Sequence, residues 1–173
     1  MPPRVFETTV LPHLDAALNF ARWLTGNDAE AEDVVQDACV RALRYFSSLR
    51  DDDARSWFFA IVRNAWYSRI SRRATVGASA LLDGSSDDRH DVALDPEAQL
   101  LQQDAVARVR EAIERLPADF REVLVLREIE GLSYREIASV VRAPIGTVMS
   151  RLARARERLL AELKPAAPLE MLP

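Results

Sequence analysis

The stretch that decides the fold runs from residue 133 to residue 164 and reads SYREIASVVRAPIGTVMSRLARARERLLAELK. Ser133 and Glu136 have the spacing of a capping box, in which each side chain accepts a hydrogen bond from the other residue's backbone N–H. Pro144 separates two helices, because proline disfavours α geometry in the residue before it and fits the start of a helix. Two helices joined by a tight turn are the pattern of a helix-turn-helix.

The second of these helices combines an apolar seam with a basic face. Steps of three and four residues predict a buried seam at Ile145, Val148, Leu152, Ala155, Leu159 and Leu163. Small residues occupy its exposed middle, and residues 144–164 hold five basic side chains against two acidic ones. We interpret this face as a surface that enters a DNA groove; the alternative is a helical hairpin whose basic face is merely solvated.

Charge is partitioned along the chain. Residues 1–74 carry ten basic and ten acidic side chains, and residues 97–173 carry twelve of each. The net charge of −4 therefore resides in residues 75–96, which contain five aspartates and one arginine and are rich in glycine and serine. This composition predicts a flexible acidic linker between two small helical domains, 1–74 and 97–164, with a short tail at 165–173. The predicted fold class is all-α.

The N-terminal half reads as helical throughout. A helix over residues 9–25 is predicted to end at Gly26. Its expected buried side consists of Leu11, Leu14, Leu18, Ala21 and Leu24. Asn27 and Glu30 suggest a second capping box, at the start of a helix whose first turns are strongly acidic. Acids at a helix start are mildly stabilising, so this face is either a solvated terminus or a docking surface for a basic partner.

A break at residues 47–53 precedes a third helix. Residues 54–74 contain five arginines and no acid, with aromatic side chains between them. The expected buried side is Trp57, Phe58, Ile61, Val62, Ala65 and Ile70. Arginines interleaved with aromatic rings suit single-stranded nucleic acid, since the cations follow the backbone and the rings stack on bases.

Several classes of protein are disfavoured. No run of 18 apolar residues and no signal peptide are found, so a membrane protein is not expected and the cytoplasm is the expected location. Cys39 is the one cysteine, and the two histidines lie far apart, so neither a disulfide nor a zinc site is predicted. No catalytic motif or cofactor-binding loop appears. The sequence indicates a non-enzymatic binding module without metal or cofactor.

Three segments together resemble a known family. Residues 31–46 (AEDVVQDACVRALRYF) and 56–73 (SWFFAIVRNAWYSRISRR) are similar to region two of bacterial sigma factors. Residues 116–159, which begin LPADFREVLVLREIEGL, are similar to region four. With only these two regions and a short linker, the chain resembles the extracytoplasmic-function (ECF) group. The resemblance implies binding to the β′ and β subunits of core RNA polymerase and to promoter DNA, and sequestration by an anti-sigma factor.

The same resemblance implies roles for individual residues. Those matched to the polymerase β′ contact are Asp33, Gln36, Asp37 and Arg41. Those matched to the minus-ten element, which is melted, are Arg50, Asp51, Arg63, Asn64, Trp66, Tyr67 and Arg69. Those matched to the minus-thirty-five element are Thr147, Ser150, Arg151, Arg154 and Arg158. Arg154 is best aimed at a guanine edge, and Met149 stands where a basic residue is usual.

Two other functions remain open at this point. A stand-alone helix-turn-helix regulator would bind operator DNA without polymerase, although it would have no need for the Asp33, Gln36 and Asp37 face. A sigma-like mimic would titrate a regulator and never bind a promoter. Such a protein would not need DNA-facing residues, so the presence of Arg154 and Asn64 argues against it. Transcription with purified core polymerase separates both from a sigma factor.

Overall fold

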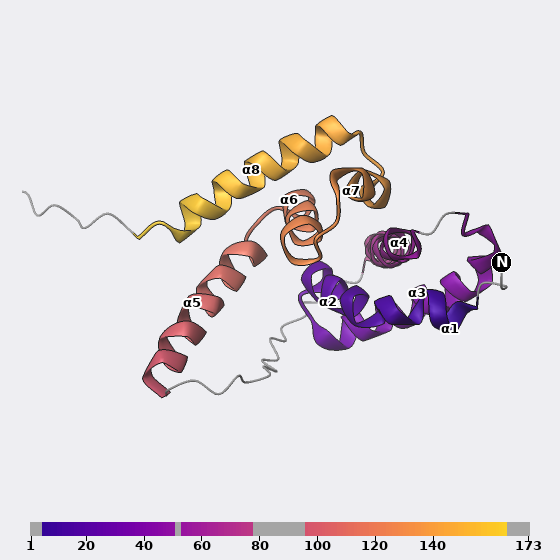
Figure 1. The fold of residues 1–173 in the computed structure, drawn as a ribbon, viewed down its shortest axis with the longest axis horizontal. Helices are drawn as coiled ribbons and strands as arrows, with labels where there is room; N and C mark the ends of the chain where they lie inside the picture. Colours follow the sequence, from indigo (N-terminus) through magenta and orange to yellow (C-terminus); the bar gives the residue numbers. More distant parts are fainter. Residues whose placement is uncertain (1–4, 51–52, 78–95, 166–173) are drawn as a thin grey trace, which may run out of the picture.

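The computed structural model describes residues 5–50, 53–77 and 96–165. Over these residues the chain forms helices and turns without a strand, so the all-α prediction is confirmed (Figure 1). The longer helices are α2 (Leu14–Thr25), α3 (Asp28–Tyr45), α4 (Ala54–Val76), α5 (Pro96–Glu114), α6 (Ala118–Leu124), α7 (Tyr134–Val141) and α8 (Ile145–Leu163). The short turns are α1 (Phe6–Thr9), η1 (Leu11–His13), η2 (Phe46–Ser48) and η3 (Val125–Ile129). Asp51, residues 78–95 of the predicted linker and residues 166–173 of the tail lie outside the described residues.

The predicted buried side of the first long helix is confirmed within α2, where Ala21 is buried and Leu14, Leu18 and Leu24 pack against the core, and is wrong at Leu11. Leu11 is 41% exposed, whereas Ala17, Phe20 and Ala21 are fully buried. Leu11 lies outside the regular helix, because Pro12 sits in the 3₁₀ turn η1 and α2 begins only at Leu14. Gly26 ends α2 as predicted, in the left-handed conformation with φ of 68° that glycine adopts readily.

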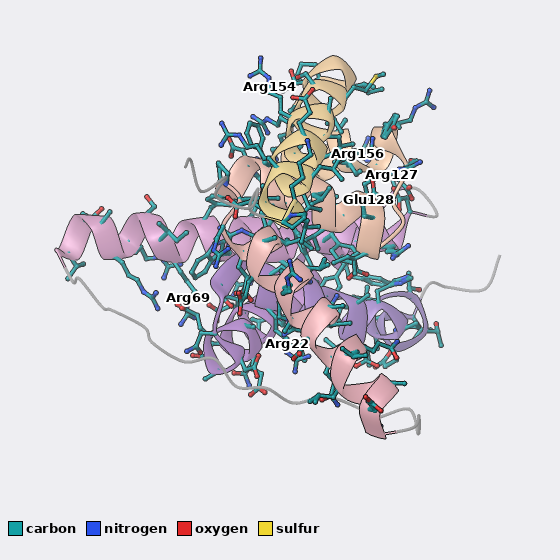
Figure 2. The ribbon with its side chains drawn as sticks, turned by 90° about the vertical axis from the view of Figure 1, so that its left-hand side faces the viewer. Arg22, Arg69, Arg127, Glu128, Arg154 and Arg156 are labelled. Carbon is teal, nitrogen blue, oxygen red and sulfur yellow. The ribbon has the colours of Figure 1, made fainter. Side chains whose placement is uncertain are left out.

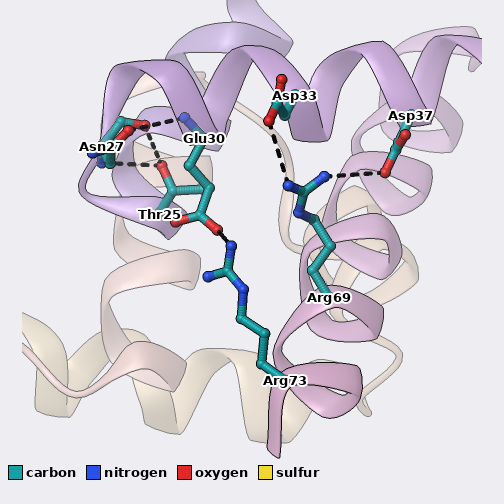
Figure 3. Close-up of polar contacts among 7 residues, drawn as sticks. All are labelled: Thr25, Asn27, Glu30, Asp33, Asp37, Arg69 and Arg73. Atoms are coloured by element: carbon teal, nitrogen blue, oxygen red, sulfur yellow. Dashed lines mark hydrogen bonds and ion pairs between the residues drawn. The ribbon is translucent and has the colours of Figure 1, made fainter. Parts of the chain in front are cut away.

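The start of α3 differs from the predicted capping box. The Asn27 side chain accepts from the N–H of Glu30 at 2.9 Å, as expected. The Asn27 N–H, however, donates to the Thr25 hydroxyl at 3.2 Å, and the Glu30 carboxylate is buried in an ion pair with Arg73 of α4 (Figure 3). Only half of the box is therefore formed. Thr25 satisfies the cap N–H, and this leaves Glu30 available for a tertiary contact.

Helix α4 packs through a face that the sequence predicted only in part. Phe58, Val62 and Ala65 are buried as expected, and Phe59 joins them in an edge-to-face contact with Phe20 at 5.3 Å between ring centroids. Ile70 is 39% exposed, which contradicts its predicted place in the core. Two phenylalanines in succession thus widen the buried face in the N-terminal turns of α4, while its C-terminal turns carry little of the core.

The helix-turn-helix forms as predicted. The Ser133–Glu136 capping box is complete, with hydrogen bonds of 3.2 Å and 2.6 Å. Helix α7 ends at Val141, the next residue Arg142 adopts φ of 53°, and Pro144 directly precedes α8. The α8 seam is buried at its centre by three residues, namely Val148, Leu152 and Ala155. Ile145 is an exception at 42% exposed, because it is the first residue of the helix.

The two halves of the chain pack against each other. Helix α4 lies beside α7, and α2 contacts α6 (Figure 1). Buried residues from both halves, such as Phe58 and Ile137, belong to one continuous apolar core. The sequence predicted two helical regions but gave no sign that they share a core, because no local pattern records which distant helix will cover a face.

Candidate functional site

The acidic face of α3 is exposed to solvent, and one arginine pairs with its carboxylates. The side chains of Asp33 and Asp37 are 62% and 48% exposed. Arg69 of α4 reaches both carboxylates, with N–O distances of 3.4 Å to Asp33 and 3.3 Å to Asp37 (Figure 3). Two residues matched to polymerase binding and one matched to the minus-ten strand are thereby brought into contact with each other.

The same side of α3 also carries apolar side chains that the sequence analysis did not single out. Val40 is 58% exposed and Leu43 is 62% exposed. They follow the exposed Gln36 at helical spacings of four and three residues, so the three side chains lie on one face. Arg41 is half-buried. An apolar residue in an amphipathic helix is ordinarily assigned to the core, which is why sequence reasoning could not find this extension.

Arg63 is not exposed on α4 but held between the halves. Its Nε donates to one oxygen of Glu122 at 2.8 Å and its Nη2 to the other at 2.9 Å. Glu122 is 1% exposed. Burial lowers the pKa of Arg63, but the hydrogen bond and the charge of Glu122 outweigh burial and raise it. This two-point contact is a buried, charge-assisted pair.

Tyr67 belongs to the same cluster. Its hydroxyl donates to Glu122 at 3.2 Å, and its ring lies 4.6 Å from the guanidinium of Arg63. Burial, followed by the charge of Glu122, raises the pKa of Tyr67 to about 12. Both the hydroxyl and one ring face of Tyr67 are thus occupied within the protein.

The remaining residues matched to the minus-ten element are less uniform. Asn64 and Trp66 are half-buried, and Trp66 packs against the apolar core. Arg50 is exposed at the end of the described segment 5–50. The structure therefore does not assemble these residues into one continuous exposed surface on α4.

The basic face of α8 is partly tied to the rest of its own half. Arg151 lies 3.7 Å from Asp119, and the guanidinium of Arg158 stands 4.9 Å from the ring centre of Phe120. Ser150 donates to the backbone oxygen of Thr147 at 3.0 Å. Arg154 is exposed and has no partner among the described residues; Figure 2 places it on the opposite side of α8 from Arg156. Of the matched residues in this helix, Arg154 is the cation that is free to reach a base.

Other kinds of site receive no support from the described residues. They contain no group of three or more histidine, cysteine or acidic side chains placed to hold a metal ion. No helix within them has the length and apolar character needed to cross a bilayer. Burial raises the pKa of the Cys39 thiol, which disfavours the thiolate form.

Comparisons with known sequences agree in both halves of the chain. The family model for sigma-70 region 2 matches residues 9–76, and that for sigma-70 region 4 matches residues 107–159. The RNA polymerase sigma-H factor of Pseudomonas aeruginosa is 34% identical over 171 residues, which cover 94% of this chain and 88% of the relative. The ECF RNA polymerase sigma-E factor of Escherichia coli is 33% identical over 143 residues, covering 79% of this chain and 75% of the relative.

Solved structures resemble the chain over nearly its whole length. The sigma factor RpoE of Bartonella quintana, in complex with the anti-sigma factor NepR, is 32% identical with a TM-score of 0.73, covering 94% of this chain and 98% of that one. CnrH, in complex with the cytosolic domain of CnrY, is 28% identical with a TM-score of 0.63, covering 91% of this chain and 86% of that one.

Proposed function

This chain belongs to the ECF group of RNA polymerase sigma factors, which direct transcription initiation, and we propose that its surfaces divide this work between α3, α4 and α8. Residues 1–74 bind core polymerase and the minus-ten element, and residues 97–164 read the minus-thirty-five element. The protein acts without catalytic chemistry of its own, in the cytoplasm, where polymerase and promoter DNA are found.

Helix α3 is the proposed contact with the β′ subunit of polymerase. The observation that carries this assignment is the exposed face on which Asp33 and Asp37 adjoin Val40 and Leu43. Carboxylates steer and orient a basic partner, while exposed apolar side chains supply the area that excludes water at the centre of an interface. Gln36 is exposed on the same face and contributes a neutral hydrogen-bonding group.

Charge reversal on this face tests the assignment. A sigma factor with Asp33→Lys and Asp37→Lys should lose co-purification with core polymerase while its far-ultraviolet circular dichroism is unchanged. The matched control reverses two exposed acids of α5, Glu97→Lys and Asp104→Lys, and should leave core binding intact. Unchanged binding by the α3 variant would remove α3 from the polymerase interface.

Promoter-directed transcription tests the function as a whole. Purified protein and core polymerase should yield discrete run-off transcripts from genomic fragments, and core polymerase alone should not. A stand-alone regulator or a sigma-like mimic would give no promoter-specific transcript in this assay. Arg154 supports the sigma reading of α8, because a mimic has no use for a cation directed at DNA.

An anti-sigma factor is the proposed regulator, since the similar protein RpoE is found in complex with the anti-sigma factor NepR. An apolar groove of about 500 Å³ runs between Trp23, α5, η3 and Leu159, and we assign the partner to it. Its rim includes Val106 and Val109, which are 50% and 39% exposed. A groove of this kind suits the apolar face of an amphipathic helix.

The groove assignment is tested by comparing activity in cells with activity in purified form. Val109→Asp should give higher reporter expression than wild type in cells that contain the native regulator, yet equal transcription with purified core polymerase. Leu100→Asp, an exposed α5 position outside the groove, is the control. Equal reporter expression from all three proteins would refute the groove as the regulator's site.

A further inference from the structure

Ionic and polar contacts join the two halves of the molecule. Besides the Arg63–Glu122 pair, Asn19 donates to the Glu130 carboxylate at 2.7 Å, and Arg55 bonds both the backbone oxygen of Glu130 and, at 3.5 Å, its carboxylate. In the same interface the second half thus presents two acids, and the first half presents arginines and an amide. The two halves are therefore complementary in charge at this interface.

Both acids are withdrawn from water. Glu122 is 1% exposed and Glu130 is 8% exposed. A buried carboxylate is tolerated only where cations and hydrogen bonds replace its hydration. The partners of both carboxylates come from the other half of the chain, 59 residues away for Arg63 and 111 residues away for Asn19. The two halves are therefore joined by buried polar contacts of Glu122 and Glu130 as well as by the apolar core.

The contacts of Glu122 occupy two side chains, Arg63 and Tyr67, that a nucleic acid would need for binding to α4. A guanidinium presents a planar fork that fits a carboxylate and a phosphate in the same two-point manner. When Glu122 fills the fork of Arg63, a phosphate cannot. The Tyr67 hydroxyl is likewise held by Glu122, and Arg63 covers one face of the Tyr67 ring, which is then closed to a stacking base.

We propose that Glu122 is an internal competitor of the promoter strand, which holds Arg63 and Tyr67 and keeps the isolated sigma factor closed. This rests on the proposed role of α4 as a minus-ten surface. The Glu130 contacts act as a second latch that holds the halves together without occupying Arg63. A partner that binds the separated halves more tightly than the packed halves releases both latches. Polymerase is such a partner if it holds the two halves apart, on the minus-ten and the minus-thirty-five element.

The Glu122 latch is tested with Glu122→Gln, which keeps the side-chain shape and removes the charge. The control is Glu128→Gln, because Glu128 pairs with Arg156 of its own half. Spin labels at Ser71→Cys in α4 and Glu157→Cys in α8, with Cys39→Ser, report the distance between the halves. Wild type and the control should give one narrow distribution, and Glu122→Gln should add a population at longer distances.

Binding to a fluorescein-labelled single-stranded DNA of mixed sequence supplies the functional arm. Release of Arg63 and Tyr67 should tighten binding by roughly three- to tenfold, since apparent affinity scales with the fraction of competent molecules. Glu130→Gln, which removes the second latch and leaves the Arg63 cluster untouched, should open the molecule and tighten DNA binding in the same direction. It serves equally if Glu122→Gln fails to fold.

The two measurements together separate the latch between the halves from the role of α4 in binding the strand. Longer distances together with tighter DNA binding support internal competition. Longer distances with unchanged DNA affinity would overturn it by showing that α4 is not the strand-binding surface, which would also remove that part of the proposed function. No change in distance or affinity for either variant would overturn the latch while promoter-directed transcription remains a separate result.

Discussion

Two basic helices, α4 and α8, look alike in sequence and differ in how their arginines are used. In α4, four arginines meet acids from other elements: Arg55 with Glu130, Arg63 with Glu122, Arg69 with Asp33 and Asp37, and Arg73 with Glu30. In α8, Arg151 and Arg156 meet acids of their own half, and Arg154 has no partner among the described residues. A basic face is therefore not the same as an available one, because pairing with acids of other elements occupies the arginines of α4.

Burial also decides how firmly each arginine is held. The side chains of Arg63 and Glu122 are 16% and 0% exposed, whereas those of Arg156 and Glu128 are 43% and 48% exposed. An exposed pair exchanges readily with water and is screened by salt, while a buried pair loses its compensation when either partner leaves. We expect α8 to be ready for DNA in the free protein and α4 to become ready only after the halves separate.

The largest effect should come from breaking this contrast on the α4 side. Arg63→Ala leaves Glu122 buried without its cation and should lower the free energy of unfolding by about 3 kcal/mol. Arg156→Ala, the matched change in α8, should cost less than about 1 kcal/mol because its pair is exposed. Urea denaturation of the two variants measures both values. Equal losses would mean that burial does not separate the two helices.

The next effect concerns the free cation of α8. Arg154→Ala should cost about 1–3 kcal/mol in promoter binding and relax the preference at one minus-thirty-five position. Arg158→Ala should weaken binding evenly across sequences and flatten its salt dependence, because its guanidinium would contact phosphate. Competition among promoter variants over a range of salt concentrations distinguishes the two. Full sequence discrimination by Arg154→Ala would refute the assignment of Arg154 to base reading.

A smaller effect is expected at Arg69, where the proposed minus-ten surface of α4 meets the proposed polymerase surface of α3. Arg69→Gln removes the cation that pairs with Asp33 and Asp37 and should raise the affinity for core polymerase by less than about 1 kcal/mol, since these pairs are exposed. The measurement is core binding without DNA, so that any strand contact of Arg69 does not enter. A fall in affinity would show that Arg69 itself contributes to the polymerase contact.

A last effect is a dependence of stability on pH in the alkaline range. The pKa of Tyr67 is raised from 10.0 to about 12 in the folded protein. Folding therefore favours the protonated phenol, and its contribution to stability is complete below pH 10 and is lost as the pH rises toward 12. Unfolding midpoints measured across this window should fall less steeply for Tyr67→Phe than for wild type. Parallel curves would indicate that Tyr67 titrates normally.

Predictions from the sequence held where a few neighbouring residues decide the outcome. Ser133 and Glu136 formed their capping box, Gly26 ended its helix, and Arg154 took an exposed position on α8. They were wrong where one residue reset the local geometry or a distant partner intervened. Pro12 left Leu11 in a 3₁₀ turn ahead of α2 and outside the core, and Arg73 drew Glu30 away from the helix start.

The sequence by itself determined the helices, the helix-turn-helix and the resemblance to sigma factors, because caps, periodicity and motifs are short-range properties of the chain. Only the tertiary structure decided which charges are available. Glu122 and Glu128 are both glutamates near the middle of the second half, yet one is buried against Arg63 and the other is exposed beside Arg156. What separates them is the approach of α4 to the second half of the chain, across 59 residues from Arg63 to Glu122. The free energy of a charged side chain depends on its burial and on the partners that the fold brings to it, and not on its neighbours in sequence.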